Sequence, residues 1–212
     1  MITVYGRATS SNVQAVMWGI AELGLAHERL DYGLAYGGND TREFLAMNPN
    51  GLVPVIRDGD LTMFESCAIL RYLATRYGAA PFWPRDPVAR APVDMWAEWG
   101  KTTFAQAFTL PIFWSRVRTP ARDRDEAALT AAIARFDGLL GMLEPRLSPF
   151  VLGRNFTLAD VVIGHVLYRY FTIDIPRPDR PAIAAYHDRL AERPGFREHV
   201  MVSWKSLEVE GA

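Results

Sequence analysis

Residues 48–74 read NPNGLVPVIRDGDLTMFESCAILRYLA, and they decide the fold of the first part of this chain. The segment opens on turn-forming residues at 48–51 and then becomes extended, with Pro54 at the start of a short strand. The Asp-Gly-Asp sequence at 58–60 predicts a turn that leads into a second short strand at 61–64. We therefore expect two strands joined by a tight turn and followed directly by a helix, whose apolar residues recur at helical spacing.

Pro54 restricts the backbone conformation of the residue before it, Val53. Proline has no N–H group, and it biases the preceding Val53 towards the extended region. Val53 therefore keeps its own N–H and C=O groups available for a partner outside the sheet. A backbone edge of this kind can pair with a peptide.

Glu65 and Ser66 stand at the start of the helix that follows. The free N–H groups and the positive end of the helix dipole at Ser66 favour a bound carboxylate, and Glu65 can hold an ammonium group. The alternative is an ordinary capping serine beside a first-turn charge. Combined with the edge at Val53, the pair suits one small ligand, a zwitterionic amino-acid head followed by a peptide backbone.

This combination of an X-Pro bond, two strands joined by a turn, and Glu-Ser at a helix start closely resembles the glutathione site of the cytosolic glutathione S-transferase family. The resemblance implies that Val53 makes an antiparallel backbone pair with the cysteinyl unit of glutathione, and that the bond between Val53 and Pro54 is cis. It also implies that Glu65 and Ser66 bind the γ-glutamyl head.

The glycine end of glutathione has no obvious partner. Many members of the family carry a basic or amide side chain where this chain has Leu52. The candidates that remain for the glycine carboxylate are Asn39, Arg42 and Asn50.

Residues 10–12, Ser-Ser-Asn, lie between the first expected strand and the first expected helix, where open α/β sheets place ligands. One of the three can simply cap the helix. In the resemblance to serine-type classes such as theta, delta and zeta, Ser10 falls on the catalytic serine, and Ser11 or Asn12 is the neighbour that caps or assists. Tyr5 is the alternative, as in tyrosine-type classes.

The implied chemistry is the activation of a bound thiol. A free thiol has a pKa of about 8.5, and each unit of lowering requires about 1.36 kcal/mol of preferential stabilisation of the thiolate. The hydroxyl of Ser10 is expected to donate a hydrogen bond to the sulfur and not to act as a nucleophile. We expect no metal, because the four histidines are scattered without ligand spacing.

The resemblance places the pocket for the second substrate, a small apolar electrophile, between the first loop and the first long helix of the second half. The residues expected to line it are Arg7, Ala8, Thr103, Phe104 and Phe108. Aromatic residues at helical spacing are more often part of a core, so most aromatics of this helix should be structural. Pro111 should kink or end the helix.

The first part of the chain is expected to form an α/β domain at residues 1–78. Outside 48–74, its expected strands and helices are residues 2–5, 12–23, 27–31 and 41–47. The resulting order, β-α-β-α-β-β-α, is that of the thioredoxin-like, glutathione-binding domain of the family.

A stiff linker at 79–87, rich in proline, is expected to separate this domain from an all-helical domain at 88–212. The expected helices of the second domain are residues 93–117, 122–147, 157–170 and 180–192. In GRNFTLAD, Thr157 and Asp160 form a variant of the capping box, which also resembles the capping motif of the family's helical domain. These two residues are expected to stabilise the fold and to take no part in catalysis.

Composition limits the partners and the compartment. A net charge of -1 over 212 residues gives no field that would attract nucleic acid or an anionic membrane. The first residues, MITVYGRATSS, lack the features of a secretory signal, and no stretch approaches the roughly 20 apolar residues of a spanning helix, so the cytoplasm is expected. The single cysteine, Cys67, excludes an internal disulfide and is expected to be a small core residue.

The leading interpretation is a detoxifying transferase that conjugates glutathione to an apolar electrophile, or uses it for isomerisation or dehalogenation. Following the family, we expect a homodimer, with an apolar patch around Met63, Phe64, Trp96 and Trp99. The first alternative is a non-catalytic interaction module on the same fold, which would not need Ser10. The second is a glutathione-dependent disulfide or peroxide reductase in which two glutathione molecules meet.

Overall fold

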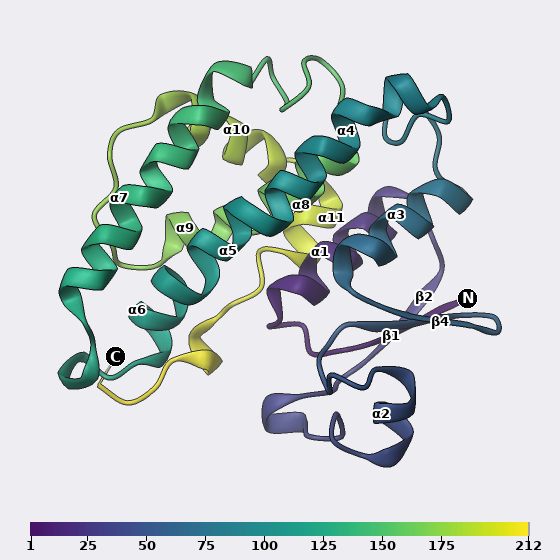
Figure 1. Cartoon of the computed structure of the whole chain (residues 1–212), viewed down its shortest axis with the longest axis horizontal. Helices are drawn as coiled ribbons and strands as arrows, with labels where there is room; N and C mark the ends of the chain where they lie inside the picture. Colours follow the sequence, from purple (N-terminus) through teal and green to yellow (C-terminus); the bar gives the residue numbers. More distant parts are fainter. Residues whose placement is uncertain (212) are drawn as a thin grey trace.

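The structure, a computed structural model, describes residues 1–211 of the chain. Figure 1 shows a smaller domain built on a four-stranded sheet, beside a larger domain of helices. The order of elements in the first domain is the predicted β-α-β-α-β-β-α, and the second domain contains no named strand within the described residues. The predicted fold class, a thioredoxin-like domain followed by an all-helical one, is confirmed.

The sheet of the first domain has the strand order β2-β1-β3-β4. Strand β1 (Ile2–Tyr5) pairs in parallel with β2 (His27–Leu30) and antiparallel with β3 (Val55–Asp58). Strand β4 (Leu61–Phe64) follows β3 after a turn in which Gly59 takes a φ of 62°, a conformation that favours glycine. The Asp-Gly-Asp signal therefore lies where the chain reverses.

Two helices of the first domain lie between the sheet and the second domain (Figure 1). Helix α1 (Ser11–Glu22) and helix α3 (Ser66–Tyr77) contact each other and also contact α8 (Leu158–Gly164) of the second domain. Because α1 is covered on both sides, all of its residues from 13 to 20 are buried. The third helix, α2 (Arg42–Met47), begins after Thr41, whose hydroxyl oxygen accepts a hydrogen bond from Phe44 N–H.

The second domain begins with one long helix that runs from residue 87 to residue 118. It is made of α4 (Pro87–Trp99), α5 (Ala105–Phe108) and α6 (Ser115–Arg118), joined by the π-helical segments η2 (Gly100–Phe104) and η3 (Thr109–Trp114). Pro111 lies inside η3, so it does not end the helix. A wide π-helical turn accommodates the missing N–H of a proline, which explains why the helix continues.

The remaining helices are shorter than predicted or more divided. They are α7 (Glu126–Leu143), α8 (Leu158–Gly164), α9 (Leu167–Thr172), α10 (Pro181–Ala191) and α11 (Pro194–His199). The helix predicted at 157–170 is interrupted at 165–166, and α11 was not predicted. A six-residue helix is too short to show a clear period in the sequence.

The two domains share one close-packed interface around Trp18. This side chain of α1 is fully buried, and its ring centroid lies 4.9 Å from that of Phe196 in α11. A Cβ atom on Gly164 or on Gly195 would come within 3.2 or 3.0 Å of the Trp18 ring. Larger residues at these two positions would push the domains apart, so the interface fixes the geometry of any site between them.

The predicted capping motif lies at the start of α8. Asp160 is completely buried, and its carboxylate accepts hydrogen bonds from the backbone N–H groups of Thr157 (2.7 Å) and Val151 (3.0 Å). The hydroxyl groups of Thr157 and Tyr186 donate to the same carboxylate, at 3.0 and 2.9 Å. Burial raises the pKa of Asp160. These contacts satisfy buried groups of the helical domain, in agreement with the predicted structural role.

Candidate active site

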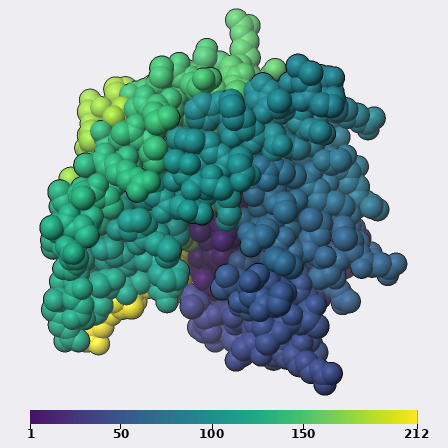
Figure 2. Space-filling view, viewed as in Figure 1, coloured from purple at the N-terminus to yellow at the C-terminus, as the bar shows by residue number. Residues whose placement is uncertain are grey.

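A cavity of about 750 Å³ opens where the two domains meet. Figure 2 shows a hollow at this junction, with the purple N-terminal segment at its floor, between the blue first domain and the teal second domain. Its walls come from the loop after β1, the segment before β3, the start of α3 and the long helix of the second domain. The volume is in the range usual for sites that bind small molecules. Within residues 1–211, no three His, Cys, Asp or Glu side chains group as a metal site.

Ser10 lies at the floor of the cavity, directly before α1. It is only 8% exposed, and its N–H donates to the carbonyl of Arg7 at 3.1 Å. Within the described residues its hydroxyl makes no hydrogen bond, so it caps nothing and is available to a ligand. Ser11 and Asn12 also line the cavity. Tyr5 does not line it and instead packs its ring edge-on against Tyr32.

Val53 presents the backbone edge that the sequence predicts. The bond between Val53 and Pro54 is cis, and both residues line the cavity. Within residues 1–211 the N–H and C=O groups of Val53 make no hydrogen bond. The turn before it is held by buried Asn48, whose Nδ2 donates to the carbonyl of Leu52 at 2.7 Å. An extended ligand can therefore pair with Val53 on a pre-formed edge.

Glu65 and Ser66 also line the cavity, where α3 begins. Glu65 has a φ of 69°, a left-handed conformation that costs a non-glycine residue about 1–3 kcal/mol. Such strain persists only where the surrounding structure imposes it, and it occurs often at ligand sites. The buried hydroxyl of Ser66 donates to Asn12 Oδ1 at 3.4 Å.

Lys101, which was not among the predicted residues, reaches this part of the cavity from η2 of the second domain. Its Nζ donates to Asn12 Oδ1 at 2.9 Å and to Ser66 Oγ at 3.2 Å. Burial lowers the pKa of Lys101, while the neighbouring Glu65 raises it. One feature of the sequence could have pointed to Lys101 as a site residue: the chain contains only two lysines, and this one lies within a helix rich in apolar residues.

The three candidates for the glycine carboxylate lie in different places. Asn39 lines the cavity, although its Nδ2 already donates to the carbonyl of Gly51 at 2.6 Å. Arg42 is exposed on α2 and does not line the cavity. Asn50 is likewise outside it, and its side chain donates to Asn48 Oδ1 at 3.0 Å.

The predicted electrophile pocket needs correction. Arg7 lines the cavity, whereas Ala8, Thr103, Phe104 and Phe108 do not. Phe104 and Phe108 are 0% and 1% exposed, and both rings pack against Phe136 in the core. The sequence pattern alone did not fix which face of the long helix is turned towards the cavity.

The long helix presents another row of residues to the cavity. The row consists of Lys101, Ala105, Thr109, Trp114 and Arg118. The spacing is four residues except between Thr109 and Trp114, where it is five. That step coincides with η3, because a π-helical turn contains an extra residue. The π-helical segment therefore keeps Trp114 and Arg118 on the cavity side.

Arg169 and His165, also absent from the predictions, close the cavity from the second domain. Arg169 is 3% exposed, and its Nη2 donates to the carbonyl of Thr9 at 2.7 Å and to Gln14 Oε1 at 3.3 Å. Burial, and then the charge of Arg7, lowers the pKa of Arg169 to about 10. Burial lowers the pKa of His165 to about 3, so this imidazole is neutral at pH 7.

Comparison with known proteins identifies the family to which this arrangement belongs. Residues 1–75 match the family described as "Glutathione S-transferase, N-terminal domain", and residues 102–194 match the corresponding C-terminal domain. The chain belongs to the glutathione S-transferase family. The two matches cover both sides of the cavity.

Several glutathione S-transferases are similar to the chain over nearly its whole length. Glutathione S-transferase GstB of Escherichia coli (strain K12) is 38% identical over 206 residues, which cover 95% of this chain and 99% of that protein. Glutathione S-transferase 3 of Zea mays is 32% identical and covers 94% of this chain and 93% of its own length. A crystal structure of the theta class glutathione S-transferase from Xanthomonas axonopodis pv. citri, with glutathione bound, has a TM-score of 0.90 and 40% identity, with 96% of this chain and 98% of that one covered.

Proposed function

We propose that the protein binds glutathione along one wall of the cavity and activates its thiol as a thiolate for attack on a small electrophile. The observation that carries this proposal is the hydroxyl of Ser10, which is buried in the cavity and free of any partner within the described residues. The same cavity contains the open backbone edge of Val53 and the helix start at Ser66. A peptide thiol that pairs with Val53 brings its sulfur towards the neighbouring Ser10.

The γ-glutamyl head of glutathione is placed at the start of α3. Its carboxylate binds the hydroxyl and N–H of Ser66, and the positive end of the helix dipole stabilises the same charge. Lys101 adds an ammonium group at this point, 3.2 Å from Ser66 Oγ. Glu65 binds the amino group of the head. Asn12 positions the two groups, because it accepts hydrogen bonds from both Lys101 and Ser66.

Ser10 acts as a hydrogen-bond donor to the sulfur. Such bonds to a charged group contribute about 1.5–3 kcal/mol, which corresponds to a thiol pKa lower by one to two units. This brings the thiol from its usual pKa of about 8.5 to near neutrality, where a useful fraction is ionised. Cys67 does not compete for this role, because it is buried on α3 and burial raises the pKa of its thiol.

A non-catalytic interaction module on the same fold is the main competing function. It would bind glutathione or a protein without needing a free hydroxyl at Ser10. Isomerisation, dehalogenation and disulfide reduction use the same activated thiol, and they differ only in the second substrate.

The decisive experiment combines binding with turnover. Glutathione is titrated into the parent protein, Ser66→Ala and the control Ser206→Ala, which changes an exposed serine outside the cavity. We expect Ser66→Ala alone to weaken binding by about tenfold, because a hydrogen bond to a charged group is lost. A panel of electrophiles then separates the functions. Binding without any rate above the uncatalysed reaction would favour the interaction module, and no binding would reject the proposal.

We also propose a homodimer in the cytoplasm, where glutathione is kept reduced. Of the patch expected from the sequence, Met63, Phe64 and Trp99 are partly exposed, whereas Trp96 is 8% exposed and stacks on Arg146. The proposed contact surface therefore uses Met63, Phe64 and Trp99 without Trp96. Light scattering at micromolar concentration should give twice the chain mass of 23.8 kDa.

Within residues 1–211 no helix has both the length and the apolar character needed to cross a membrane.

A further inference from the structure

The charges that line the cavity are strongly unequal. Four side chains with basic groups, Arg7, Lys101, Arg118 and Arg169, face one carboxylate, Glu65. Lys101 and Glu65 lie at the same end and influence each other. The other three basic groups are guanidinium groups, and no further carboxylate is present among the residues that line the cavity. The whole chain has a net charge of only -1, so the excess is local.

The three guanidinium groups are near neighbours, with Arg7 in the middle. The charge of Arg118, in addition to burial, lowers the pKa of Arg7, and the charge of Arg7 in turn lowers the pKa of Arg169. Arg169 is buried, and Arg7 and Arg118 are partly exposed. Repulsion among these like charges opposes folding, and a bound anion would offset it.

The same arginines have hydrogen-bonding capacity that the protein does not use. Nε of Arg7 and Nε of Arg169 are buried without a hydrogen-bond partner within residues 1–211. None of Arg7, Arg118 and Arg169 forms an ion pair within that range. Arg118 lies 4.5 Å from the ring centroid of Trp114, and Arg169 lies 4.5 Å from that of Phe113 in addition to its two hydrogen bonds. Both Nε atoms are enclosed by protein, whereas Arg7 and Arg169 line the cavity with other atoms, so a bound anion would meet the rest of each side chain.

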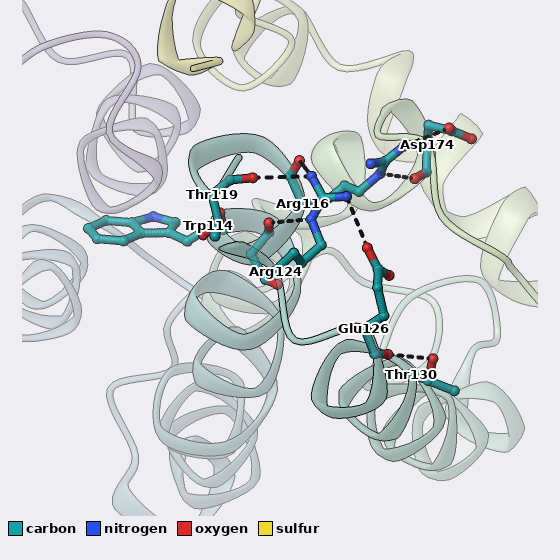
Figure 3. Close-up of polar contacts among 8 residues, drawn as sticks. Trp114, Arg116, Thr119, Arg124, Glu126, Thr130 and Asp174 are labelled. Carbon is teal, nitrogen blue, oxygen red and sulfur yellow. Dashed lines mark hydrogen bonds and ion pairs between the residues drawn. The ribbon is translucent and has the colours of Figure 1, made fainter. Parts of the chain in front are cut away.

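Two other arginines of the same region are bound to acceptor groups of the protein. Figure 3 shows Arg116 donating to the backbone carbonyl and the carboxylate of Asp174, at 2.7 and 2.9 Å. It also shows Arg124 bound to the carboxylate of Glu126 and to backbone carbonyls at the end of α6. Trp114 projects away from this network in Figure 3, and it lines the cavity together with Arg118. The network thus fixes the helix end that carries Arg118, a residue of the cavity lining.

We propose that Arg7, Arg118 and Arg169 form an anion subsite, and that the second substrate is an electrophile with an apolar body and a carboxylate or similar anionic group. Trp114 and Leu110 provide exposed apolar surface beside the subsite. The apolar body packs there while the anion binds the guanidinium groups. This inference rests on the proposed function, and it replaces the purely apolar electrophile expected from the sequence.

Two sources can supply the anion, because glutathione itself has a glycine carboxylate. Arg118 lies seventeen residues beyond Lys101, which is about 25 Å along a helix. Three extended residues span only about 10 Å, and the γ-linkage of the glutamyl unit adds only two further carbons to this length. A glutathione molecule whose head is bound at Lys101 and Ser66 therefore leaves the Arg118 end of the cavity for the electrophile.

The first test measures binding alone, with S-methylglutathione present to fill the glutathione site without a reactive thiol. We expect 4-methylbenzoate to bind the parent protein about tenfold or more tightly than neutral 4-methylbenzamide, as for a charge-assisted hydrogen bond. Arg118→Gln should remove this preference, Arg118→Lys should keep part of it, and Arg122→Gln, an exposed arginine outside the cavity, should not change it.

The second test measures turnover with 4-(chloromethyl)benzoate and 4-(chloromethyl)benzamide. The sulfur of the thiolate forms a bond to the benzylic carbon as the C–Cl bond breaks, chloride leaves with the electron pair, and the thiol proton passes to solvent. We expect kcat/KM to be about tenfold or more higher for the benzoate, and Arg118→Gln to lower it for the benzoate only.

Equal binding of 4-methylbenzoate and 4-methylbenzamide by the parent would overturn the anion subsite. A second result would also overturn it: Arg118→Gln binds S-methylglutathione about tenfold more weakly but still prefers 4-methylbenzoate. In that case Arg118 binds the glycine carboxylate of glutathione and not the second substrate. If the benzoate preference is present but neither chloride is conjugated, the subsite stands and the proposed transferase chemistry fails. Conjugation of the benzamide alone would overturn the inference and leave the transferase function intact.

Discussion

The ammonium group of Lys101 lies 2.9 Å from Asn12 Oδ1, and this contact joins the long helix of the second domain to the first turn of α1. The same ammonium donates to Ser66 Oγ at 3.2 Å, where α3 begins. Each of the three residues comes from a different helical segment, and all of them line one cavity. The proposed binding site for the γ-glutamyl head is therefore complete only when both domains are in place.

Lys101→Met should weaken glutathione binding by about tenfold or more. The substitution keeps much of the apolar stem and removes a charge-assisted hydrogen bond to the carboxylate, which is worth about 1.5–3 kcal/mol. Calorimetric titration of glutathione measures the change, and Lys205→Met, at an exposed position outside the cavity, is the matched control. Equal affinity in parent and Lys101→Met would place the head elsewhere.

The two lysines of the chain also permit a direct check without mutation. Acetic anhydride labels free amines, and peptide mass spectrometry distinguishes Lys101 from Lys205. Saturating glutathione should slow the labelling of Lys101 and leave Lys205 as an internal reference.

The sequence predicts the first half of the site well, because its signals are local. Turn residues and a proline around Val53, and a Glu-Ser pair at a helix start, specify backbone geometry within a few residues of themselves. The two strands and the lining positions of Val53 and Ser66 lie where these signals place them. The cis bond at Pro54 and the place of Ser10 in the cavity agree with what the resemblance to the family implies. The roles of these residues in binding and catalysis remain predictions.

The second half of the site depends on packing between distant segments. Two π-helical segments determine which face of the long helix is turned to the cavity, and a simple helical period in the sequence does not reveal them. Phe104 and Phe108, which were predicted to line the pocket, therefore lie in the core. Arg169 reaches Thr9 across 160 positions of sequence, so no local pattern could place it in the cavity. The excess of guanidinium groups becomes visible only when these segments come together.

Ser10→Ala should raise the pKa of the bound thiol by about one unit or more and lower turnover at neutral pH about tenfold, with little change in glutathione affinity. The reason is that the hydroxyl stabilises the thiolate more than the thiol. The thiolate absorbance of the complex in the ultraviolet, followed as pH rises, gives the pKa directly. Ser11→Ala is the control, because Ser11 borders the same cavity. A shift in Ser11→Ala alone would transfer the role to that residue.

Asp160→Ala should destabilise the protein by about 3 kcal/mol or more. It removes the acceptor for two backbone N–H groups and for the hydroxyl groups of Thr157 and Tyr186, all of which are buried. Urea denaturation measures the effect, with Asp188→Ala as the control because that side chain is 80% exposed. Equal midpoints in the two variants would show that the carboxylate has no structural role.

His165 should make the protein less stable as the pH falls below 6.5. Burial lowers the pKa of this imidazole from 6.5 to about 3, with a smaller effect from the charge of Lys101. Between these two values the unfolded chain binds a proton that the folded chain does not, so the free energy of unfolding falls as the pH is lowered. The loss attributable to His165 is about 2 kcal/mol on going from neutral pH to pH 5.

The variant His165→Asn tests this prediction. In the parent protein Nδ1 of His165 donates to the carbonyl of Val162 at 2.8 Å. The amide of asparagine can still donate to that carbonyl, but it does not titrate. Urea denaturation at a series of pH values should therefore give a shallower dependence for the variant, and identical slopes for the two proteins would show that His165 is protonated in the folded state at pH 5.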